Sequence, residues 1–507
     1  MPTVHVEFFE QQLTALRAAG PVQVPHFVSG WIDDDAVIQR HDPCHPGSVI
    51  STCGEASDLL VDRAVAEARQ AATTWGVTPV AQRVKAIRQL LDLLTERRRT
   101  EIAALIALET GKNRAECIGE VDELAVLIDC YTAAGADPAA WEEPLQQVNP
   151  FATSRSVLRP FGVFGVISPF NYPMVLGAGP ALAALVAGNT VVWKPSHVGP
   201  RSAHAFAELI ADSDLNNGVF QMVLGGDSPG RRVVDLVDGV AFTGSVEAGL
   251  AIRAAASAGP FPRPVIAELG GKNPVVVTDT ADLEVAASAI VSAAFGMSGQ
   301  RCSAASRVIV TTRAHDRLVE LLLEATANLV VADPVSPACS LGPVVDEQAM
   351  TRLDQSLATA RRDGTVAAGG RSALGGLFVD PVIVTDLPQG HALTREELFL
   401  PFLTVTRVET FEEALTEANA TKYGLTAGIY SGNEAELTQF ALRMESGCIN
   451  VNKPGGGTTG WWPGNQTFGG WKASGLSGKQ AFGGWYVQQF AREQCVTLAS
   501  GLEFPVY

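Results

Sequence analysis

The sequence predicts an α/β protein with a Rossmann-like, doubly wound cofactor domain, a second α/β domain and a small β element. Three observations support this prediction. The first part of the chain repeats apolar residues at helical spacing, and from about residue 158 short apolar runs alternate with helices. The same alternation returns from about residue 274. At 507 residues the chain is also too long for one hydrophobic core, so we expect two or three domains.

The alternating regions define the domain boundaries that we predict. We assign residues 1–139 and 159–273 to the dinucleotide-binding domain and residues 274–486 to the catalytic domain. Residues 140–158 and 487–507 lie outside both alternating regions, and such segments are candidates for subunit contacts. We therefore expect these two segments to form a small oligomerisation element.

The bulk composition excludes several classes of partner. With 54 acidic and 37 basic residues, the formal net charge of −17 repels phosphate backbones and anionic membranes, so we expect neither as a partner. Residues 161–193 carry no charged side chain, which raises the question of a membrane span. However, Pro169, Pro173 and Pro180 divide this run into pieces of strand and helix length, as in a buried β-α-β unit.

The cysteines and the N-terminus indicate the compartment. The eight cysteines are scattered, with no CxxC pair and no Cys/His cluster at ligand spacing, so we predict free thiols and no metal site. The N-terminal residues lack the basic start and apolar block of a secretory signal. We therefore expect a cytoplasmic protein.

Two glycine-containing turns are candidate phosphate-binding sites. The stretch VLGGDSPG supplies Gly225, Gly226 and Gly230 but lacks the GxGxxG pattern, so this signal alone is weak. The stretch AFTGSVEAG ends a strand and opens a helix, so its amides and a hydroxyl group can hold a phosphate; the alternative is a simple tight turn.

Four single residues carry candidate chemistry, and each has a plainer alternative. Lys194 ends the apolar strand NTVVWKP at the sheet edge where ligands bind in open α/β folds, although it can equally be a surface lysine. Glu268 in ELGGKNP can act as a general base or cap a strand end. Asn171 in SPFNYP can donate to an oxyanion or cap a turn. Cys302 in GQRCSAASR can be a nucleophile, its pKa lowered by Arg301 or by exposed amides, or a packed core residue.

Taken in order, SPFNYP, GNTVVWKPS, FTGS, ELGGKNP, GQRCSAASR, EELFLPF, YGLTAGIY and TFGGWKASG resemble the NAD(P)-dependent aldehyde dehydrogenase superfamily over roughly residues 25–495. Within it, ETGKNRAECIGEVDELAVLIDCY, INVNKP and FGGWKASG are most similar to the branch of 1-pyrroline-5-carboxylate (glutamate semialdehyde) dehydrogenases. The resemblance implies the aldehyde dehydrogenase fold, an NAD or NADP cofactor, a small aldehyde substrate, and a homodimer or homotetramer.

The resemblance also implies a mechanism. Cys302 attacks the aldehyde, while Asn171 and the Cys302 N–H hold the oxyanion of the thiohemiacetal. Loss of hydride leaves a thioester, which water activated by Glu268 hydrolyses. The implied cofactor contacts are Ser168, Pro169, Phe170, Lys194, Ser196, His197, Gly226, Gly230, Thr243, Gly244, Ser245, Glu268, Leu269, Gly270, Glu397 and Phe399.

The chain departs from the family pattern at both ends of the site. His197 stands where NAD-preferring relatives carry a glutamate against the ribose, so NADP stays open beside NAD. At the substrate end, Trp461 stands in the loop TTGWWPGNQTFGG where relatives carry a small residue. Its ring can fill the pocket for a substrate carboxylate, form an aromatic wall for a bulkier aldehyde, or pack within the loop or a subunit contact. The expected substrate contacts are Asn171, Arg301, Ser303, Gly460, Trp461 and Phe468.

The leading function is therefore oxidation of a semialdehyde such as glutamate 5-semialdehyde to the carboxylate. The alternatives are oxidation of a bulkier or aromatic aldehyde, a non-catalytic nucleotide-binding protein of the same fold, and a thioesterase-like hydrolase that uses the same cysteine.

Overall fold

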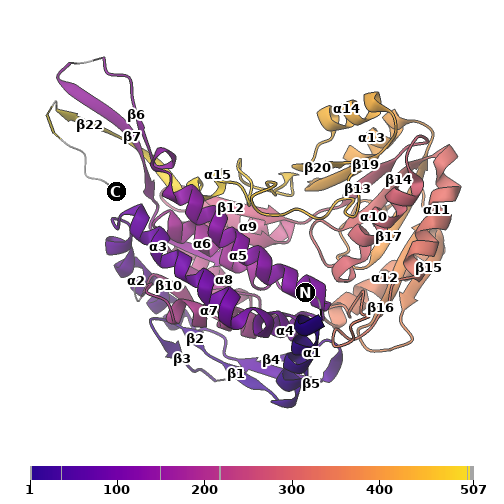
Figure 1. The fold of residues 1–507 in the computed structure, drawn as a ribbon, viewed down its shortest axis with the longest axis horizontal. Coiled ribbons are helices and arrows are strands. Elements are labelled where there is room, and N and C mark those ends of the chain that lie inside the picture. Colours follow the sequence, from indigo (N-terminus) through magenta and orange to yellow (C-terminus); the bar gives the residue numbers. More distant parts are fainter. Residues whose placement is uncertain (1–2, 36, 149, 216–217, 500, 503–507) are drawn as a thin grey trace.

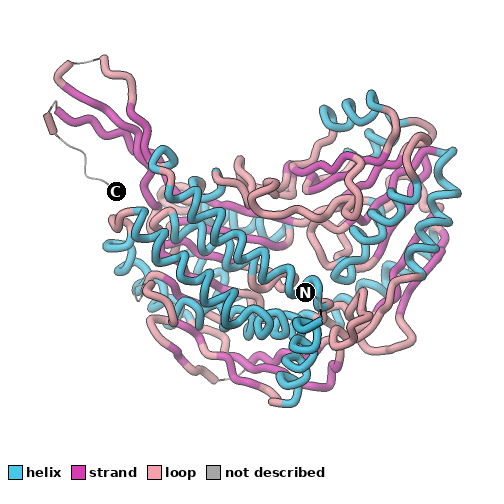
Figure 2. Tube along the Cα trace, viewed as in Figure 1, coloured by secondary structure: helices cyan, strands magenta, loops and turns pink. Residues whose placement is uncertain are grey.

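A computed structural model describes residues 3–35, 37–148, 150–215, 218–499 and 501–502. Figure 1 shows two bodies side by side, one indigo to magenta and one orange, with an arm projecting from the first. Figure 2 shows that each body combines strands with covering helices. The predicted α/β class is confirmed, while residues 1–2, 500 and 503–507 of the predicted domains lie outside the described part.

The first body is built around a seven-stranded sheet in the order β12-β11-β8-β9-β10-β2-β3. The five strands from β12 to β10 are parallel, as predicted for a doubly wound sheet, and the antiparallel strands β2 and β3, which were not predicted, extend the edge at β10. The strands are β2 (His26–Phe27), β3 (Trp31–Ile32), β8 (Val163–Ile167), β9 (Thr190–Lys194), β10 (Phe220–Met222), β11 (Gly239–Gly244) and β12 (Val265–Leu269).

The uncharged segment 161–193 forms β8, α6 (Val175–Val186) and β9, in line with the predicted β-α-β reading. The helix packs closely on the sheet, because a Cβ added to Gly177 would lie 2.1 Å from the Trp193 ring. Only glycine allows this approach. Among the described residues, no helix is both long and apolar enough to cross a membrane.

Helices cover both faces of this sheet, and the predicted helical N-terminal region forms most of them (Figure 1). The long helical pattern ending at Gly111 is interrupted by a π-helical turn at Leu93–Arg98, and Gly111 ends it in a left-handed conformation with φ +75°. The helices are α1 (Thr3–Ala18), α2 (Asp58–Trp75), α3 (Val80–Asp92), α4 (Arg99–Thr110), α5 (Arg114–Ala136), α7 (Pro200–Ala211), α8 (Asp227–Leu236) and α9 (Val246–Ser257).

The second body contains a seven-stranded sheet in the order β15-β16-β17-β14-β13-β19-β20, antiparallel only between β15 and β16. Its strands are β13 (Asn273–Val277), β14 (Ala305–Thr311), β15 (Thr365–Arg371), β16 (Val379–Thr385), β17 (Phe402–Val408), β19 (Thr426–Tyr430) and β20 (Cys448–Val451). Its helices are α10 (Leu283–Phe295), α11 (Thr312–Ala327), α12 (Glu347–Asp363), α13 (Phe411–Asn419) and α14 (Glu434–Arg443).

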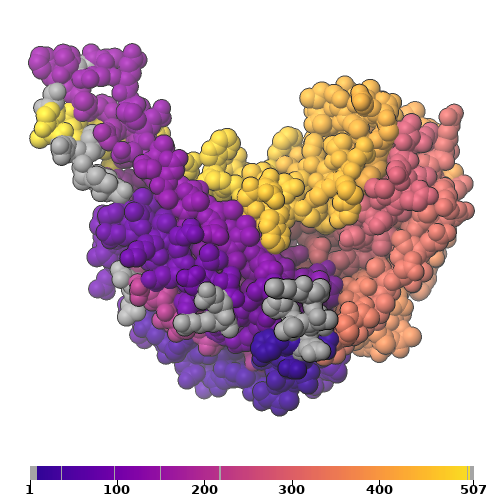
Figure 3. Space-filling view, viewed as in Figure 1, coloured from indigo at the N-terminus to yellow at the C-terminus, as the bar shows by residue number. Residues whose placement is uncertain are grey.

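The arm is a three-stranded antiparallel sheet of β6 (Glu142–Pro144), β7 (Ala152–Pro160) and β22 (Ala491–Ala499). These strands come from the two segments predicted to form the oligomerisation element, whose role in subunit contacts stays a prediction. Figure 3 shows the arm standing clear of the remaining surface, and yellow C-terminal residues covering the region between the two bodies.

Smaller elements complete the chain. A three-stranded sheet joins β1 (Val22–Val24), β5 (His45–Cys53) and β4 (Ile38–Asp42), and β18 (Tyr423–Gly424) pairs with β21 (Trp471–Lys472). The short helix α15 (Trp485–Gln488) precedes β22, and 3₁₀ turns occupy Pro138–Ala140, Gly296–Gly299 and Ala392–Thr394.

Candidate active site

The site lies at the carboxyl edge of the first sheet, where strand order reverses between β8 and β11. Open α/β sheets bind ligands in such a crevice, because the loops leaving neighbouring strands diverge there. A cavity of about 310 Å³ occupies this position. Its lining residues are Pro169, Phe170, Asn171, Leu176, Thr243, Gly244, Ser245, Glu268, Leu269, Gly270, Cys302, Glu397 and Phe399, all predicted site residues except Leu176.

Cys302 reaches the cavity on a tightly constrained loop between α10 and β14. Met297, Ser298 and Gly299 all have positive φ angles, of 53°, 53° and 68°. Two hydrogen bonds fix the loop, because Glu116 accepts from the Met297 N–H at 2.7 Å and the Asn273 amide donates to the Cys302 carbonyl at 2.7 Å. Non-glycine residues held at positive φ cost free energy, and such strain is concentrated at functional sites.

Gly299 also brings the loop that carries Cys302, the nucleophile loop, close to the backbone of the segment that carries Glu397. A Cβ at this position would lie 2.1 Å from the Leu400 carbonyl oxygen. No side chain fits there. The two loops are therefore in direct backbone contact beside the cavity.

Glu268, near the end of β12, faces Cys302 across the cavity. Both carboxylate oxygens are buried and have no hydrogen-bond partner of ordinary geometry within the described chain. Burial raises the pKa of Glu268 to about 8, the nearby thiol of Cys302 opposes this shift, and the charge of Glu397 adds to it. Burial and the Glu268 carboxylate likewise raise the pKa of the Cys302 thiol well above its usual value, so the expectation that Arg301 or exposed amides lower this pKa was wrong. The pair therefore holds a protonated thiol beside a carboxyl group that titrates near neutral pH.

Asn171 is fully buried, and its side-chain amide donates one hydrogen bond to the Gln300 carbonyl at 3.1 Å. An amide nitrogen carries two hydrogens, so a second donor stays available. Because Gln300 lies two residues before Cys302, this contact ties the Asn171 loop to the nucleophile loop.

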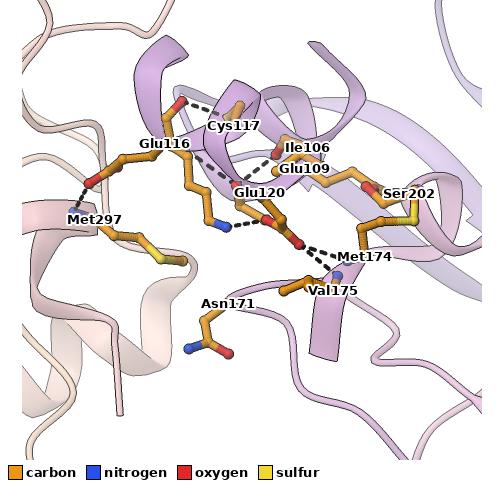
Figure 4. Close-up of polar contacts among 12 residues, drawn as sticks. Ile106, Glu109, Glu116, Cys117, Glu120, Asn171, Met174, Val175, Ser202 and Met297 are labelled. Atoms are coloured by element: carbon orange, nitrogen blue, oxygen red, sulfur yellow. Dashed lines mark hydrogen bonds and ion pairs between the residues drawn. The ribbon is translucent and has the colours of Figure 1, made fainter. Parts of the chain in front are cut away.

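A buried polar network supports the Asn171 loop from behind (Figure 4). The Glu120 carboxylate accepts hydrogen bonds from the N–H groups of Met174 and Val175, at 2.9 and 3.1 Å, where α6 begins. Its other oxygen pairs with the Lys112 ammonium, which also lies 3.7 Å from the centre of the Tyr172 ring. A carboxylate at a helix N-terminus is favourable, and here it fixes the backbone that follows Asn171.

Glu397 and Phe399 form the opposite wall of the cavity. Glu397 accepts a hydrogen bond from the Gly271 N–H at 2.8 Å, and burial raises its pKa to about 7. A Cβ added to Gly270 would lie 2.2 Å from a Glu397 oxygen, so this approach requires glycine. Phe399 has φ +56° and its ring meets Phe170 edge-on at 5.8 Å between centroids.

A second group of predicted residues lies further along the sheet edge, around the N-termini of two helices. Ser245 caps α9, accepting from the Ala248 N–H at 3.2 Å, and Gly226 precedes α8. Lys194 is buried, and its ammonium makes only a long contact of 3.5 Å to the Gly225 carbonyl. A buried amine beside two helix N-termini and thin glycine backbone suits the phosphates and ribose of a dinucleotide.

Three residues predicted near Lys194 have local roles in the structure. The Ser196 hydroxyl accepts from the Val198 N–H at 3.2 Å, and His197 lies at the surface. The Ser168 hydroxyl accepts from the Trp193 indole at 2.9 Å, which leaves its backbone rather than its side chain to face a cofactor.

Of the predicted substrate contacts, only Asn171 lines this cavity, and the others lie outside its lining. Arg301 is paired with Glu116 at 2.6 Å, and its Nε is buried without a hydrogen-bond partner among the described residues. The Ser303 carbonyl accepts from the Thr458 hydroxyl at 2.6 Å. This bond ties the loop that carries Cys302 to the loop TTGWWPGNQTFGG, which begins at Thr458.

The loop TTGWWPGNQTFGG carries Trp461, which packs on the same apolar cluster as Cys302. Its indole donates to the Thr458 carbonyl at 3.1 Å, and its ring packs against a cluster that includes Cys302 and Phe468. Lys453 lies 5.3 Å from the Trp461 ring and donates to the Gly460 carbonyl at 2.7 Å. Trp461 is thus held by its own loop and packs on the same apolar cluster as Cys302, without lining the cavity.

Sequence reasoning missed Glu116, Glu120 and Lys112, which support the site without lining the cavity. They belong to the helical segment ETGKNRAECIGE, where their acidic and basic side chains resemble an ordinary solvated helix face. Their distinguishing feature is that Lys112 and Glu120 are buried, and a single sequence carries no signal of this.

Comparison with known proteins places these features in context. A model described as the aldehyde dehydrogenase family matches residues 31–496. N-succinylglutamate 5-semialdehyde dehydrogenase 1 of Caulobacter vibrioides is 39% identical over 448 residues, covering 86% of this chain and 91% of that protein. The 1-pyrroline-5-carboxylate dehydrogenase of a Geobacillus strain is 33% identical, covering 92% and 91%.

Solved structures give the same picture. A 1-pyrroline-5-carboxylate dehydrogenase from Thermus with bound NAD has a TM-score of 0.92 and 29% identity, with 97% of this chain and 96% of that one covered. Proline utilization A from Bdellovibrio bacteriovorus also gives a TM-score of 0.92 at 32% identity and covers 97% of this chain, which spans 51% of that larger protein.

Proposed function

This chain belongs to the aldehyde dehydrogenase family and is an NAD(P)-dependent oxidoreductase; from that premise we propose that it oxidises a semialdehyde through a covalent intermediate on Cys302. The observation that carries the proposal is the shared cavity of Cys302, Glu268 and Asn171. A nucleophile, a base with a pKa near 8 and an amide donor surround one space. These are the groups that aldehyde oxidation to an acid requires.

The residues divide the chemistry between them. The Cys302 thiol passes its proton to the adjacent Glu268 carboxylate, which releases it to solvent, and the sulfur adds to the carbonyl carbon. The free N–H of Asn171 with the Cys302 N–H stabilises the oxyanion of the thiohemiacetal. A bound nicotinamide supplies the acceptor for the hydride that leaves this carbon. The thioester that results is attacked by water as Glu268 takes its proton, which releases the carboxylate and restores the thiol.

The cofactor face consists of two parts. Glu397 and Phe399 flank the cavity that would hold the nicotinamide ribose, while Lys194, Gly226, Gly230 and Ser245 surround the position suited to the phosphates and adenosine. The Lys194 ammonium supports this assignment, because within the described chain its hydrogen bond to Gly225 is long. Burial of a cation without a strong partner is unfavourable unless a ligand accepts its hydrogen bonds.

The substrate is proposed to be a semialdehyde with a carboxylate at its far end, such as glutamate 5-semialdehyde. Arg301 is the supporting observation, because its buried Nε–H has no partner in the described chain and lies one residue from the nucleophile. A second candidate is N-succinylglutamate 5-semialdehyde, the substrate named for the 39% identical relative. Its one additional carboxylate matches a guanidinium better than an aromatic aldehyde would.

Assembly and compartment are also part of the proposal. The projecting sheet of β6, β7 and β22 supports a homodimer or homotetramer, since an isolated arm gains little from its own chain (Figure 1). The mass of the particle in solution tests this. The unpaired state of all eight cysteines supports a reducing, cytoplasmic setting.

Incubation with NAD or NADP and a panel of semialdehydes, followed by absorbance of the reduced cofactor, tests the activity. We expect turnover with glutamate 5-semialdehyde or its N-succinyl derivative and little with benzaldehyde. Absence of cofactor reduction with every aldehyde, in folded protein, would contradict the proposal. Hydrolysis of activated esters alone would favour the hydrolase alternative.

Asn171→Ala is expected to lower kcat by about 10²–10³-fold, because removing one oxyanion donor costs this much in comparable sites. KM should change little, since the donor acts mainly on the developing charge. Steady-state kinetics measure both. Asn328→Ala, which removes an exposed amide at the end of α11, is the control and should keep the full rate. An equal loss in both variants would contradict the role of Asn171.

Arg301→Met is expected to raise KM for a carboxylate-bearing semialdehyde by about 10–100-fold, the usual range for one lost charge-assisted hydrogen bond. KM for an uncharged aldehyde of equal length should be unchanged. Because the substitution leaves Glu116 unpaired, the double variant Arg301→Met, Glu116→Gln separates recognition from stability. A similar rise in KM for both aldehydes would argue against carboxylate recognition.

A further inference from the structure

A carboxylate outside every recognised motif lies at the cofactor face. Glu55 belongs to the loop between β5 and α2, which is attached to the end of β10 by a hydrogen bond of 2.9 Å from the Ala56 N–H to the Leu224 carbonyl. A Cβ built on Gly226 would lie 3.4 Å from a Glu55 carboxylate oxygen. One built on Gly225 would lie 3.1 Å from its Cγ. The carboxylate therefore lies directly over the glycine turn that leads into α8.

The glycine turn has no room for a larger residue under Glu55. Gly225 has φ +138°, and a Cβ there would also meet Pro229 at 2.6 Å. Glycine thus permits both the turn and the close approach of Glu55. Glu55 itself is exposed, and within the described chain its carboxylate has no hydrogen bond or ion pair.

The charges around this turn are predominantly negative. Burial lowers the pKa of Lys194, and the carboxylates of Asp227 and Glu55 oppose the shift, so both lie close to its ammonium. His197 is exposed, but partial desolvation by the chain packed around it and the charges of Lys194 and Arg40 lower its pKa, against Asp227 and Asp346, so it adds no full charge at neutral pH. Two carboxylates therefore face one ammonium across the turn.

Arg40 and Asp346 do not change this balance. The Arg40 guanidinium is buried and donates to the carbonyls of Glu109 and Val345, so it is already engaged. Asp346 accepts from the Ala349 N–H at 2.8 Å as the cap of α12. The carboxylates next to the turn are therefore those of Asp227, which follows Gly226 in the chain, and Glu55.

The two dinucleotides differ only at the ribose 2′ position. A carboxylate accepts a hydrogen bond from the free 2′-hydroxyl of NAD, whereas it repels the 2′-phosphate of NADP. His197 stands where an NAD-selecting glutamate was expected, so the strand that carries Lys194 does not supply this group. Glu55 supplies a carboxylate at the same turn from a distant segment of the chain.

We propose that Glu55 is a specificity-determining residue that contacts the adenosine ribose and selects NAD over NADP. This inference rests on the proposed function, in which Lys194 and the turn at Gly225 and Gly226 hold the adenosine half of the cofactor. It resolves the choice that His197 leaves open in favour of NAD.

Isothermal titration calorimetry of the full chain with NAD⁺ and with NADP⁺, without aldehyde, tests the inference. The wild type should bind NAD⁺ at least about 10-fold more tightly than NADP⁺, and Glu55→Gln should reduce this ratio by about 10-fold, the size of one charge-assisted hydrogen bond. Glu55→Asp keeps the charge but shortens the reach, so it should weaken NAD⁺ while NADP⁺ stays excluded. Glu434→Gln, an exposed glutamate at the start of α14, is the matched control.

Each outcome decides a different statement. If Glu55→Gln binds both dinucleotides with the wild-type ratio, or if Asp227→Asn alone changes the ratio, the assignment of Glu55 is overturned and the proposed function stands. A wild type that prefers NADP⁺ also overturns it. If the folded wild type binds neither dinucleotide, the proposed function itself fails. Thermal unfolding of each variant confirms that the compared proteins are folded.

Discussion

Replacing Cys302 with serine is expected to lower kcat for semialdehyde oxidation by at least about 10³-fold, because a serine hydroxyl is far less acidic and less nucleophilic than a thiol. Cofactor binding should persist, since the Cys302 side chain is not among the groups around Lys194. Steady-state cofactor reduction and calorimetric titration with NAD⁺ measure the two properties separately. The combination of lost turnover and kept binding is specific to a nucleophile.

Cys495→Ser is the matched control, because Cys495 is a free thiol exposed on the arm. It should keep the wild-type rate. Retention of more than a tenth of the rate in Cys302→Ser would contradict the covalent mechanism. Loss of NAD⁺ binding in that variant would instead indicate a structural role for the cysteine.

Glu268→Gln is expected to lower steady-state turnover by about 10²–10⁴-fold, the usual contribution of a positioned general base. Hydrolysis of the thioester should fail while its formation continues, so rapid-mixing experiments should show about one equivalent of reduced cofactor per site before turnover stops. Intact-protein mass spectrometry should then detect the acyl group on Cys302. Rapid steady-state turnover without an accumulated acyl-enzyme would argue against this role.

The pH dependence follows from the raised pKa of Glu268, about 8. Below this pH the carboxyl group is protonated and cannot accept a proton from water, so kcat should rise as pH increases through about 8. The Gln variant should lose this dependence. The charge of Glu268 also raises the pKa of Cys302, so in Glu268→Gln the alkylation of Cys302 by iodoacetamide should become faster at a given pH. Glu417→Gln is unsuitable as a control, because Glu417 pairs with Arg395 in the second body.

The sequence predicts the groups of the cavity because each follows a strand of a parallel sheet. Asn171, Glu268 and the turn at Ser245 come directly after β8, within β12 and after β11, and parallel strands bring their carboxyl ends to one edge. The spacing of the apolar runs therefore predicts that these residues lie together at one edge of the sheet. Cys302 required the resemblance, since its local surroundings are compatible with either packing or chemistry.

The residues that support the cavity could not be predicted in this way. Glu120 meets Val175, and Glu116 meets Arg301, across 55 and 185 positions of sequence. Glu55 reaches the glycine turn through a loop whose path depends on how β5 and α2 are packed. The spacing of apolar residues predicts which face of a helix or strand is buried, but it does not predict which distant segment packs against that face. Strand pairs such as β2 with β3 were also too short to give a period.

The missing side chain at position 299 has a consequence for how the site accommodates change. Backbone contact with Leu400 makes the nucleophile loop and the Glu397 loop behave as one rigid unit. We therefore expect substitutions at Trp461 or Arg301 to change which aldehyde is bound without moving Cys302 relative to Glu397. Substrate recognition and catalysis are then expected to depend on different residues.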